Sequence, residues 1–139
     1  MKSLFAALAA ALALTALVFA EDHAYKKNAT VHDWMEVVVK PTNDKLAAMK
    51  KAGGPQNKDD WKHSNAWASV LAESGQLMLM DGRIKDDVWA DGAKKMVAGA
   101  EAAMIASMRG DAEGWNTSLG QIGGGCRTCN KVHKPKKKE

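Results

Sequence analysis

Two cysteines and a histidine near the C-terminus form the chain's most chemically distinctive stretch. The sequence from Cys126 to His133 reads CRTCNKVH, so the two thiols lie three residues apart. On a helix, this spacing places both thiols on one face about one turn apart, where they can reach the two vinyl groups of a porphyrin. The pattern Cys-x-x-Cys-His marks covalent attachment of haem, and its histidine ligates the iron. Here Asn130 stands at the histidine position.

Asn130 and His133 are the two candidate iron ligands that follow the cysteines. An amide oxygen is a poor partner for ferrous haem, whose axial ligands are usually histidine, cysteine or methionine. His133 lies four residues after Cys129, on the same face, but about 5 Å further along the helix axis than the usual ligand. It reaches iron only if the helix unwinds or the haem sits differently. The alternative interpretation of His133 is an exposed histidine in a basic helix end.

The same residues permit two other kinds of site. Cys126, Cys129 and His133 offer three of the four ligands that a zinc or copper ion needs, although nothing in the sequence marks a fourth. A redox-active Cys-x-x-Cys pair normally opens a helix beside a strand, and no strand is predicted here. A disulfide within so short a loop would add little stability. A metal or dithiol site therefore stays as an alternative to haem.

The N-terminus has the pattern of a secretory signal peptide. Lys2 precedes an almost unbroken run of Ala, Leu, Val and Phe over residues 4–19, and the side chains before Ala20 suit cleavage after that residue. The run is shorter than the roughly 18–20 residues that a membrane-spanning helix needs, and polar residues follow at once. We therefore expect residues 1–20 to be a signal peptide and the protein to be exported to the periplasm without a membrane span.

The remaining chain has the size of one domain and is mildly basic. The full sequence has 139 residues, with 20 Lys and Arg against 16 Asp and Glu, which gives a net charge of +4. Most of the excess lies in the lysine-rich C-terminus and gives no reason to expect a nucleic-acid partner. We expect one domain over residues 21–134 and a basic tail over residues 135–139. No catalytic carboxylate pair, nucleophile triad or phosphate loop is recognisable, so we do not expect an enzyme.

Four acidic residues, each followed closely by a tryptophan, recur at nearly regular intervals in this domain. They are Asp33, Asp60, Asp87 and Asp111. Acidic residues favour the first turn of a helix, and glycine or proline punctuates the chain between them. Apolar residues follow helical periodicity without strand-like alternation. The pattern predicts four helices near residues 30–52, 58–80, 86–108 and 111–132, and their short connections favour an all-α, antiparallel up-down-up-down four-helix bundle.

Two places in these helices are expected to be irregular. Pro41 lies inside the first predicted helix and should kink or break it around Lys40, because proline removes a backbone donor. Gly123, Gly124 and Gly125 precede the cysteine pair, and three consecutive glycines form a poor helical segment. They either break the fourth helix or make room for something large and flat against its backbone. Both interpretations agree equally with the sequence.

An exported four-helix bundle with Cys-x-x-Cys at the end of its fourth helix resembles cytochrome c′ and its relatives. The resemblance covers residues 29–134. It includes Met35 and a Lys-Pro step in the first helix, LMLMDGR at the end of the second, and a basic residue, Lys134, four positions after the ligand position. The resemblance implies haem c bound through thioethers at Cys126 and Cys129, and a role in electron transfer or small-gas binding. It also implies an electron-transfer protein or a gas as partner, and a homodimer that pairs through its first two helices.

The departure from this family lies at the iron. Asn130 replaces the proximal histidine, which the family's haem-attachment machinery also reads, so ligation and loading are both expected to be weaker. On the opposite haem face, the family's first helix supplies the nearest side chain. Met35 is the candidate there, with His32 one turn before it, and ordinary core packing is the alternative for Met35. For the whole chain, the alternative is a haem-free relative that keeps the fold as a binding or structural module.

Overall fold

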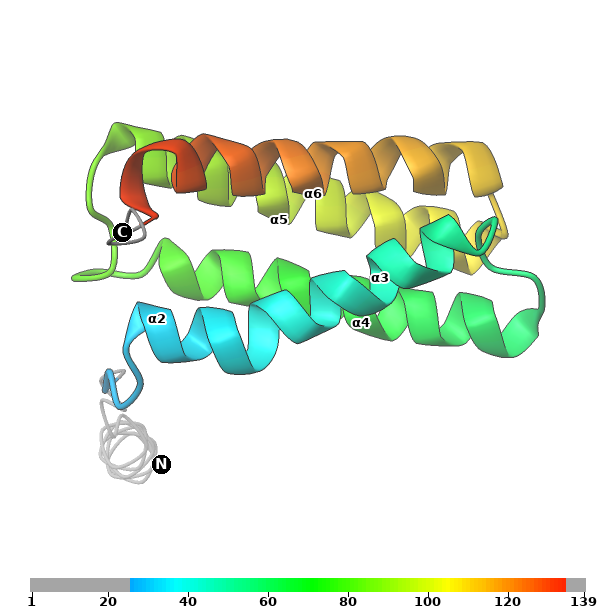
Figure 1. Cartoon of the computed structure of the whole chain (residues 1–139), viewed down its shortest axis with the longest axis horizontal. Helices are drawn as coiled ribbons and strands as arrows, with labels where there is room; N and C mark the ends of the chain where they lie inside the picture. The colour runs from blue at the N-terminus through cyan, green and yellow to red at the C-terminus, as the bar shows by residue number, and fades with distance from the viewer. Residues whose placement is uncertain (1–25, 135–139) are drawn as a thin grey trace, which may run out of the picture.

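The computed structural model describes residues 26–134, in which every regular element is a helix. The predicted signal peptide and basic tail lie outside the described residues. The first helix runs through three consecutive segments, α2 (Val31–Trp34), η1 (Met35–Val39) and α3 (Lys40–Lys51), and is followed by α4 (Lys58–Met78), α5 (Asp87–Arg109) and α6 (Ala112–His133) (Figure 1). The four predicted helices are confirmed, each end within two residues of its predicted position. None of the described helices has the length and apolar character needed to cross a bilayer.

Each of the four helices begins at a side chain that accepts a backbone N–H three residues further on. These caps are Thr30, Asn57, Asp86 and Asp111. Such side chains satisfy donors that the first turn of a helix leaves free. Asp33 completes a reciprocal capping box with Thr30. The recurring acidic residues therefore mark the helix starts as predicted, except that Asp86 caps α5 and Asp87 is the first residue of that helix.

The first helix is continuous, but its hydrogen bonding widens just before Pro41. In the π-helical turn η1, the N–H of Lys40 donates to the carbonyl oxygen of Met35, five residues earlier. Pro41 has no N–H to donate and its ring crowds the preceding turn, so an irregular turn is favoured at this point. The distortion predicted near Lys40 therefore takes the form of a π-helical turn. Of the predicted kink or break, the break does not occur, because α3 follows without interruption.

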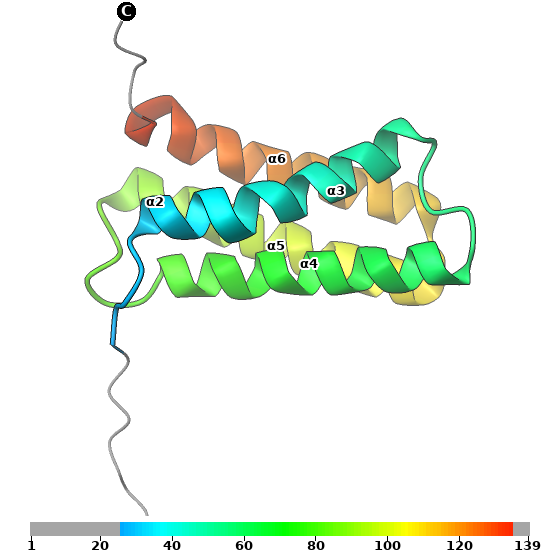
Figure 2. The same ribbon diagram turned by 60° about the horizontal axis from the view of Figure 1, so that its bottom comes forward.

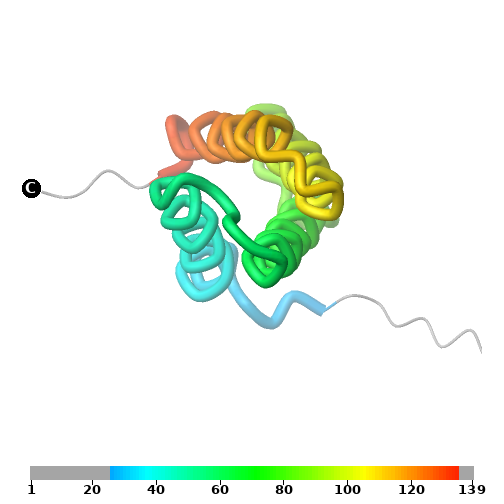
Figure 3. Tube along the Cα trace, turned by 90° about the vertical axis from the view of Figure 1, so that its right-hand side faces the viewer, coloured from blue at the N-terminus to red at the C-terminus, as the bar shows by residue number. Residues whose placement is uncertain are grey.

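The most extensive contacts in the bundle are those of α5 with α4 and α6. The first helix packs on α4 and meets α6 mainly through α3. The α3–α4 and α5–α6 connections lie at one end of the molecule, whereas the α4–α5 connection lies at the other end, beside the last turn of α6 (Figures 1 and 2). Viewed along their length, the four helices surround a common core (Figure 3). The described residues thus form a packed bundle of four helices.

Two buried tryptophans anchor the bundle with bonded indole groups. Trp115 is fully buried, and its Nε1 donates to Ser64 Oγ at 2.6 Å, which in turn lies 3.0 Å from Ser107 Oγ. Trp89 is 3% exposed, and its Nε1 donates to the carbonyl oxygen of Met78 at 3.0 Å. A buried indole needs such an acceptor because it has lost its bond to water. Trp115 lies in the first turn of α6 and Trp89 in the first turn of α5.

Candidate functional site

Cys126 and Cys129 lie in the C-terminal half of α6, and both are free thiols. Cys126 is half-buried and packs against the core, whereas Cys129 is buried, with 9% of its surface exposed. The Sγ of Cys129 donates to the carbonyl oxygen of Trp89 at 3.5 Å. The two thiols therefore differ in their surroundings. Cys129 is held in the interface with α5, and Cys126 is the more accessible of the two.

The thiol of Cys129 fits against α5 because Gly92 has no side chain. A Cβ atom at Gly92 would collide with Cys129 Sγ. A Cβ atom at Gly125 would lie 2.6 Å from the carbonyl oxygen of Gly92 and 2.7 Å from the backbone nitrogen of Met96. Such distances are too short for real side-chain contacts, so only glycine is accommodated at these places. The two glycines let the backbones of α5 and α6 touch beside the cysteine pair.

The three consecutive glycines of α6 neither break the helix nor share one environment. The helix continues through them to His133, so the predicted helix break is wrong. Gly125 is covered by α5, which leaves no room there for a flat ligand. A Cβ atom at Gly123 would lie 3.4 Å from Arg127 Nη1, whereas one at Gly124 would meet nothing within 4 Å. Of the three glycines, Gly124 is the one with open space over it.

Burial raises the pKa of both thiols above the ordinary value for cysteine. For Cys129, the neighbouring Cys126 and the carboxylates of Asp86 and Asp91 raise the pKa further, because negative charge nearby disfavours a thiolate. Both cysteines are therefore protonated at neutral pH. Since the thiolate is the nucleophile and the metal ligand, neither cysteine is activated for reaction by its surroundings.

Asn130 is exposed on the surface of α6. Its backbone carbonyl oxygen accepts the backbone N–H of Lys134 at 3.2 Å and so takes part in the last turn of the helix. One residue after Cys129, it lies about 100° further around the helix than the buried thiol. The amide at the expected ligand position therefore faces solvent.

His133 lies in the last turn of α6 and contacts the start of α5. Its Nε2 lies 3.1 Å from Asp86 Oδ1, and its ring meets the Trp89 ring edge-on with centroids 5.5 Å apart. The side chain of His133 is 15% exposed, so its interpretation as an exposed histidine is wrong. The same Asp86 oxygen accepts the backbone N–H of Trp89 at 2.8 Å. That bond, together with the imidazole, holds the pKa of Asp86 below its ordinary value.

Met35 lies in η1, on the first helix, and is partly buried against the core. η1 packs on α4, and no comparable interface joins it to α6. His32 is exposed. The structure therefore brings His133 and Cys129 to one place at the start of α5, but does not pack Met35 against the cysteine-bearing half of α6.

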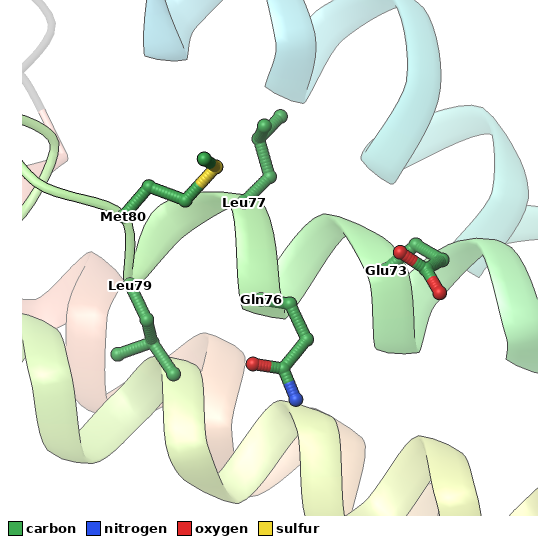
Figure 4. Close-up of a pocket in the computed structure, with 5 residues that line it drawn as sticks. All are labelled: Glu73, Gln76, Leu77, Leu79 and Met80. Carbon is green, nitrogen blue, oxygen red and sulfur yellow. The ribbon is translucent and has the colours of Figure 1, made fainter. Parts of the chain in front are cut away.

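Two further kinds of site were considered, a cluster of metal ligands and a surface groove. Within residues 26–134, no group of three or more His, Cys, Asp or Glu side chains is placed to hold a metal ion. A groove of about 350 Å³ at the end of α4 is lined by Glu73, Gln76, Leu77, Leu79 and Met80 (Figure 4). Leu77 and Met80 project toward the first helix, and Gln76 and Leu79 project to the other side of α4. A second groove of about 480 Å³ lies between the end of α5 and the start of α6. Neither groove is lined by a cysteine or histidine.

Sequence reasoning missed the residues of α5 that surround Cys129 and His133. Asp86, Trp89 and Gly92 were not among the predicted site residues. The adjacent acidic pair Asp86-Asp87 before a tryptophan signals a helix start, but its sequence position says nothing about α6. Asp86 and His133 are 47 residues apart, so their contact depends on the packing of the two helices.

The described residues fit the attachment of haem better than its ligation. Two thiols one helical turn apart match the thioether positions, and Cys126 is half-buried, whereas Cys129 is buried against α5. By contrast, Asn130 faces solvent and His133 Nε2 is bonded to a carboxylate. The chain matches no model of a protein family, no curated protein and no solved structure in the comparisons made with each.

Proposed function

We propose that this chain is an exported haem-binding protein of the cytochrome c′ kind with weakened iron ligation. The observation that carries the proposal is the placement of Cys126 and Cys129 three residues apart, near the end of the fourth helix of a four-helix bundle. On this proposal residues 1–20 are a secretory signal peptide and the protein is periplasmic. Its helices form an antiparallel up-down-up-down bundle, which the alternating ends of the three connections support (Figure 1).

In this proposal Cys126 and Cys129 hold haem c through two thioether bonds. Bound haem would supply an iron atom for one-electron transfer or for binding a small gas, and the protein would not be an enzyme. Asn130 stands at the expected ligand position and His133 is the substitute, but the first is exposed and the second is bonded to Asp86. Met35 stays the candidate side chain for the opposite face, although no extensive contact joins η1 to α6. The iron would therefore be ligated more weakly than by a proximal histidine.

A haem-free relative that keeps the fold is the second candidate. The observation that favours it is the same pair of ligand positions, because Asn130 presents no imidazole and His133 already has a carboxylate partner. In that case the bundle is a binding or structural module with one half-buried and one buried thiol. A metal site built from Cys126, Cys129 and His133 has less support, because the described residues include no group of three potential ligands arranged to hold an ion.

The proposed partners are a small gas or an electron-transfer protein, together with a second copy of the chain. The first two helices carry exposed apolar side chains, with Val37 74% and Val70 39% exposed, which would suit pairing through these helices. Sedimentation of the mature chain tests the homodimer. A dimer that dissociates in Val37→Asp and persists in Met108→Asp, a substitution at an equally exposed position on α5, supports pairing through the first two helices. A monomeric wild-type chain contradicts it.

The haem proposal is tested by expressing the full chain in an export host with haem-attachment machinery. Intact mass and the spectrum of the reduced pyridine complex are then measured. A mass gain of one haem, with the spectrum of a doubly thioether-linked haem, supports the proposal. An apo mass with two free or oxidised thiols supports the haem-free relative. Asn130→His is the control, because it restores the motif that the machinery reads; equal loading of both chains would mean that Asn130 does not weaken attachment.

A further inference from the structure

The last turn of α6 is fastened to the first turn of α5 by a small set of contacts that we call the clasp. It consists of Lys85, Asp86, Trp89 and His133. His133 Nε2 lies 3.1 Å from Asp86 Oδ1, and its ring meets Trp89 edge-on. Lys85 Nζ lies 4.9 Å from the centroid of the Trp89 ring, within the range of a cation–π contact. The clasp therefore surrounds one buried indole with two charged groups and an imidazole.

The clasp is continuous with the Cys129 thiol. The carbonyl oxygen of Trp89 accepts the Cys129 S–H at 3.5 Å, and Gly92, in the next turn of α5, makes room for the sulfur. Cys129 lies one turn of α6 before His133. His133 is thus the last side chain that ties this turn to α5, since Lys134 ends the helix with an exposed side chain. Helix ends without tertiary contacts open with little cost in free energy.

We propose that His133 is a positioning residue that holds the Cys129 thiol in the α5–α6 interface. By protecting Cys129, the clasp makes a thiol reagent react faster with Cys126 than with Cys129. Cys126 lies a turn further from the helix end and is the more exposed of the two thiols. This role does not depend on haem attachment. It bears on attachment because a thioether sulfur carries no hydrogen to donate to Trp89, so a linked Cys129 would lose this bond.

The proposal is tested by the alkylation rates of the two thiols in the full-length, haem-free protein. Iodoacetamide is the probe, and peptide mass spectrometry assigns modification to each cysteine. In the wild type, Cys126 should react faster than Cys129. In His133→Ala, we expect the rate at Cys129 to rise by about tenfold or more, while the rate at Cys126 changes by less than about twofold, because local opening exposes only the last turns of α6.

Conservative variants separate positioning from general stability. His133→Gln keeps an N–H donor for Asp86, and His133→Phe keeps a ring against Trp89, so each should restore part of the protection at Cys129. Asp86→Asn keeps the cap of α5 but weakens the bond to His133. Asp111→Asn is its matched control, since Asp111 makes the same kind of cap at the start of α6 and has no histidine partner among its described bonds.

The pattern of rates distinguishes a specific role of the clasp from a contribution to overall stability. Selective acceleration of Cys129 in His133→Ala and Asp86→Asn, with no selectivity in Asp111→Asn, supports the clasp. Equal acceleration of both thiols means that His133 contributes only to overall stability and overturns the proposal. An unchanged Cys129 rate in His133→Ala also overturns it. Haem loading is measured separately by mass, so loss of loading with an intact clasp would contradict only the proposed function.

Discussion

The two buried tryptophans in the first turns of α5 and α6 lie in different surroundings. Trp115 is fully buried and donates to Ser64 Oγ, and its ring meets the Trp61 ring edge-on with centroids 6.4 Å apart. Trp89 is nearly as buried, but it is flanked by Lys85 and His133, and its backbone binds Asp86 and Cys129. One indole lies among neutral groups and the other among titratable ones.

This difference indicates that the two ends of α6 serve different purposes. The start of α6, around Trp115, is built from apolar and hydroxyl groups that a core needs for stability. The end of α6 carries the thiol pair, and its contacts are polar, partly exposed and close to the helix terminus. Contacts of this kind add less to global stability and are more easily opened. Substitutions should therefore affect stability most at the first end and thiol chemistry most at the second.

The largest expected effect is that of Trp115→Ala. Removing a fully buried indole leaves a cavity and deprives Ser64 of a donor, so the free energy of unfolding should fall by about 3–5 kcal/mol. Urea denaturation followed by circular dichroism measures it. His133→Ala, at the other end, should cost far less. If the two substitutions destabilise equally, the proposed contrast between the ends of α6 is wrong.

The glycines beside the cysteine pair should respond in opposite ways to a methyl group. Gly125→Ala forces a Cβ atom to within 2.6 Å of the Gly92 carbonyl oxygen, and should cost about 1–3 kcal/mol of unfolding free energy through overpacking. Gly124→Ala is the matched control one residue earlier, where a Cβ atom meets nothing within 4 Å. It should be neutral or should stabilise the helix by up to about 1 kcal/mol. Equal destabilisation in thermal or urea unfolding would contradict the close approach of α5.

Ser64→Ala removes the hydroxyl that accepts the indole N–H of Trp115, without creating a large cavity. The substitution leaves the indole N–H and the Ser107 hydroxyl without the partner that now bonds both. We expect a loss of about 1–3 kcal/mol in unfolding free energy, the range for a buried donor that loses its acceptor. Ser69→Ala is the control, because the hydrogen bond described for that hydroxyl runs to the backbone carbonyl oxygen of Asn65 in its own helix. A smaller effect at Ser64 than at Ser69 would contradict the assigned role.

The smallest expected effect is a pH dependence that comes from the thiols. Burial raises the folded-state pKa of Cys126 and Cys129, so their contribution to stability is fully present below the ordinary cysteine pKa and is lost as pH rises through the raised values. The urea midpoint should therefore decline at alkaline pH. Because lysines titrate there too, the readout is the difference from a Cys126→Ala/Cys129→Ala variant. Parallel pH profiles for the two proteins would show that the thiols are not desolvated.

The helices could be predicted from the sequence because their starts and stops are local. Asp33, Asp60 and Asp111 lie in or just before first turns, and glycine or proline follows each helix, so short stretches carry the signal. Even the irregularity before Pro41 was placed correctly, since a missing backbone donor acts on its own turn. Its form, a π-helical turn in a continuous helix, could not be predicted from the proline alone.

The surroundings of the cysteines could be predicted only in part. Their spacing places both thiols on α6, but the role of Gly125 depends on Gly92, on another helix, and the contact of His133 depends on Asp86, at the start of α5. Such contacts are set by the register of α5 against α6, which no local pattern encodes. Motif reasoning therefore found the residues with chemistry, and missed the side chains that hold them in place.

The most direct test of the central claim, that Cys126 and Cys129 are a haem-attachment site, is the intact mass of the protein after export from cells with haem-attachment machinery. We predict that at least part of the wild-type protein gains one haem, that the loaded fraction is larger in Asn130→His, and that the Cys126→Ala/Cys129→Ala variant gains none. If the wild type carries no haem and Asn130→His is fully loaded, the fold can hold haem but Asn130 prevents its attachment. No loading in either protein would contradict the claim.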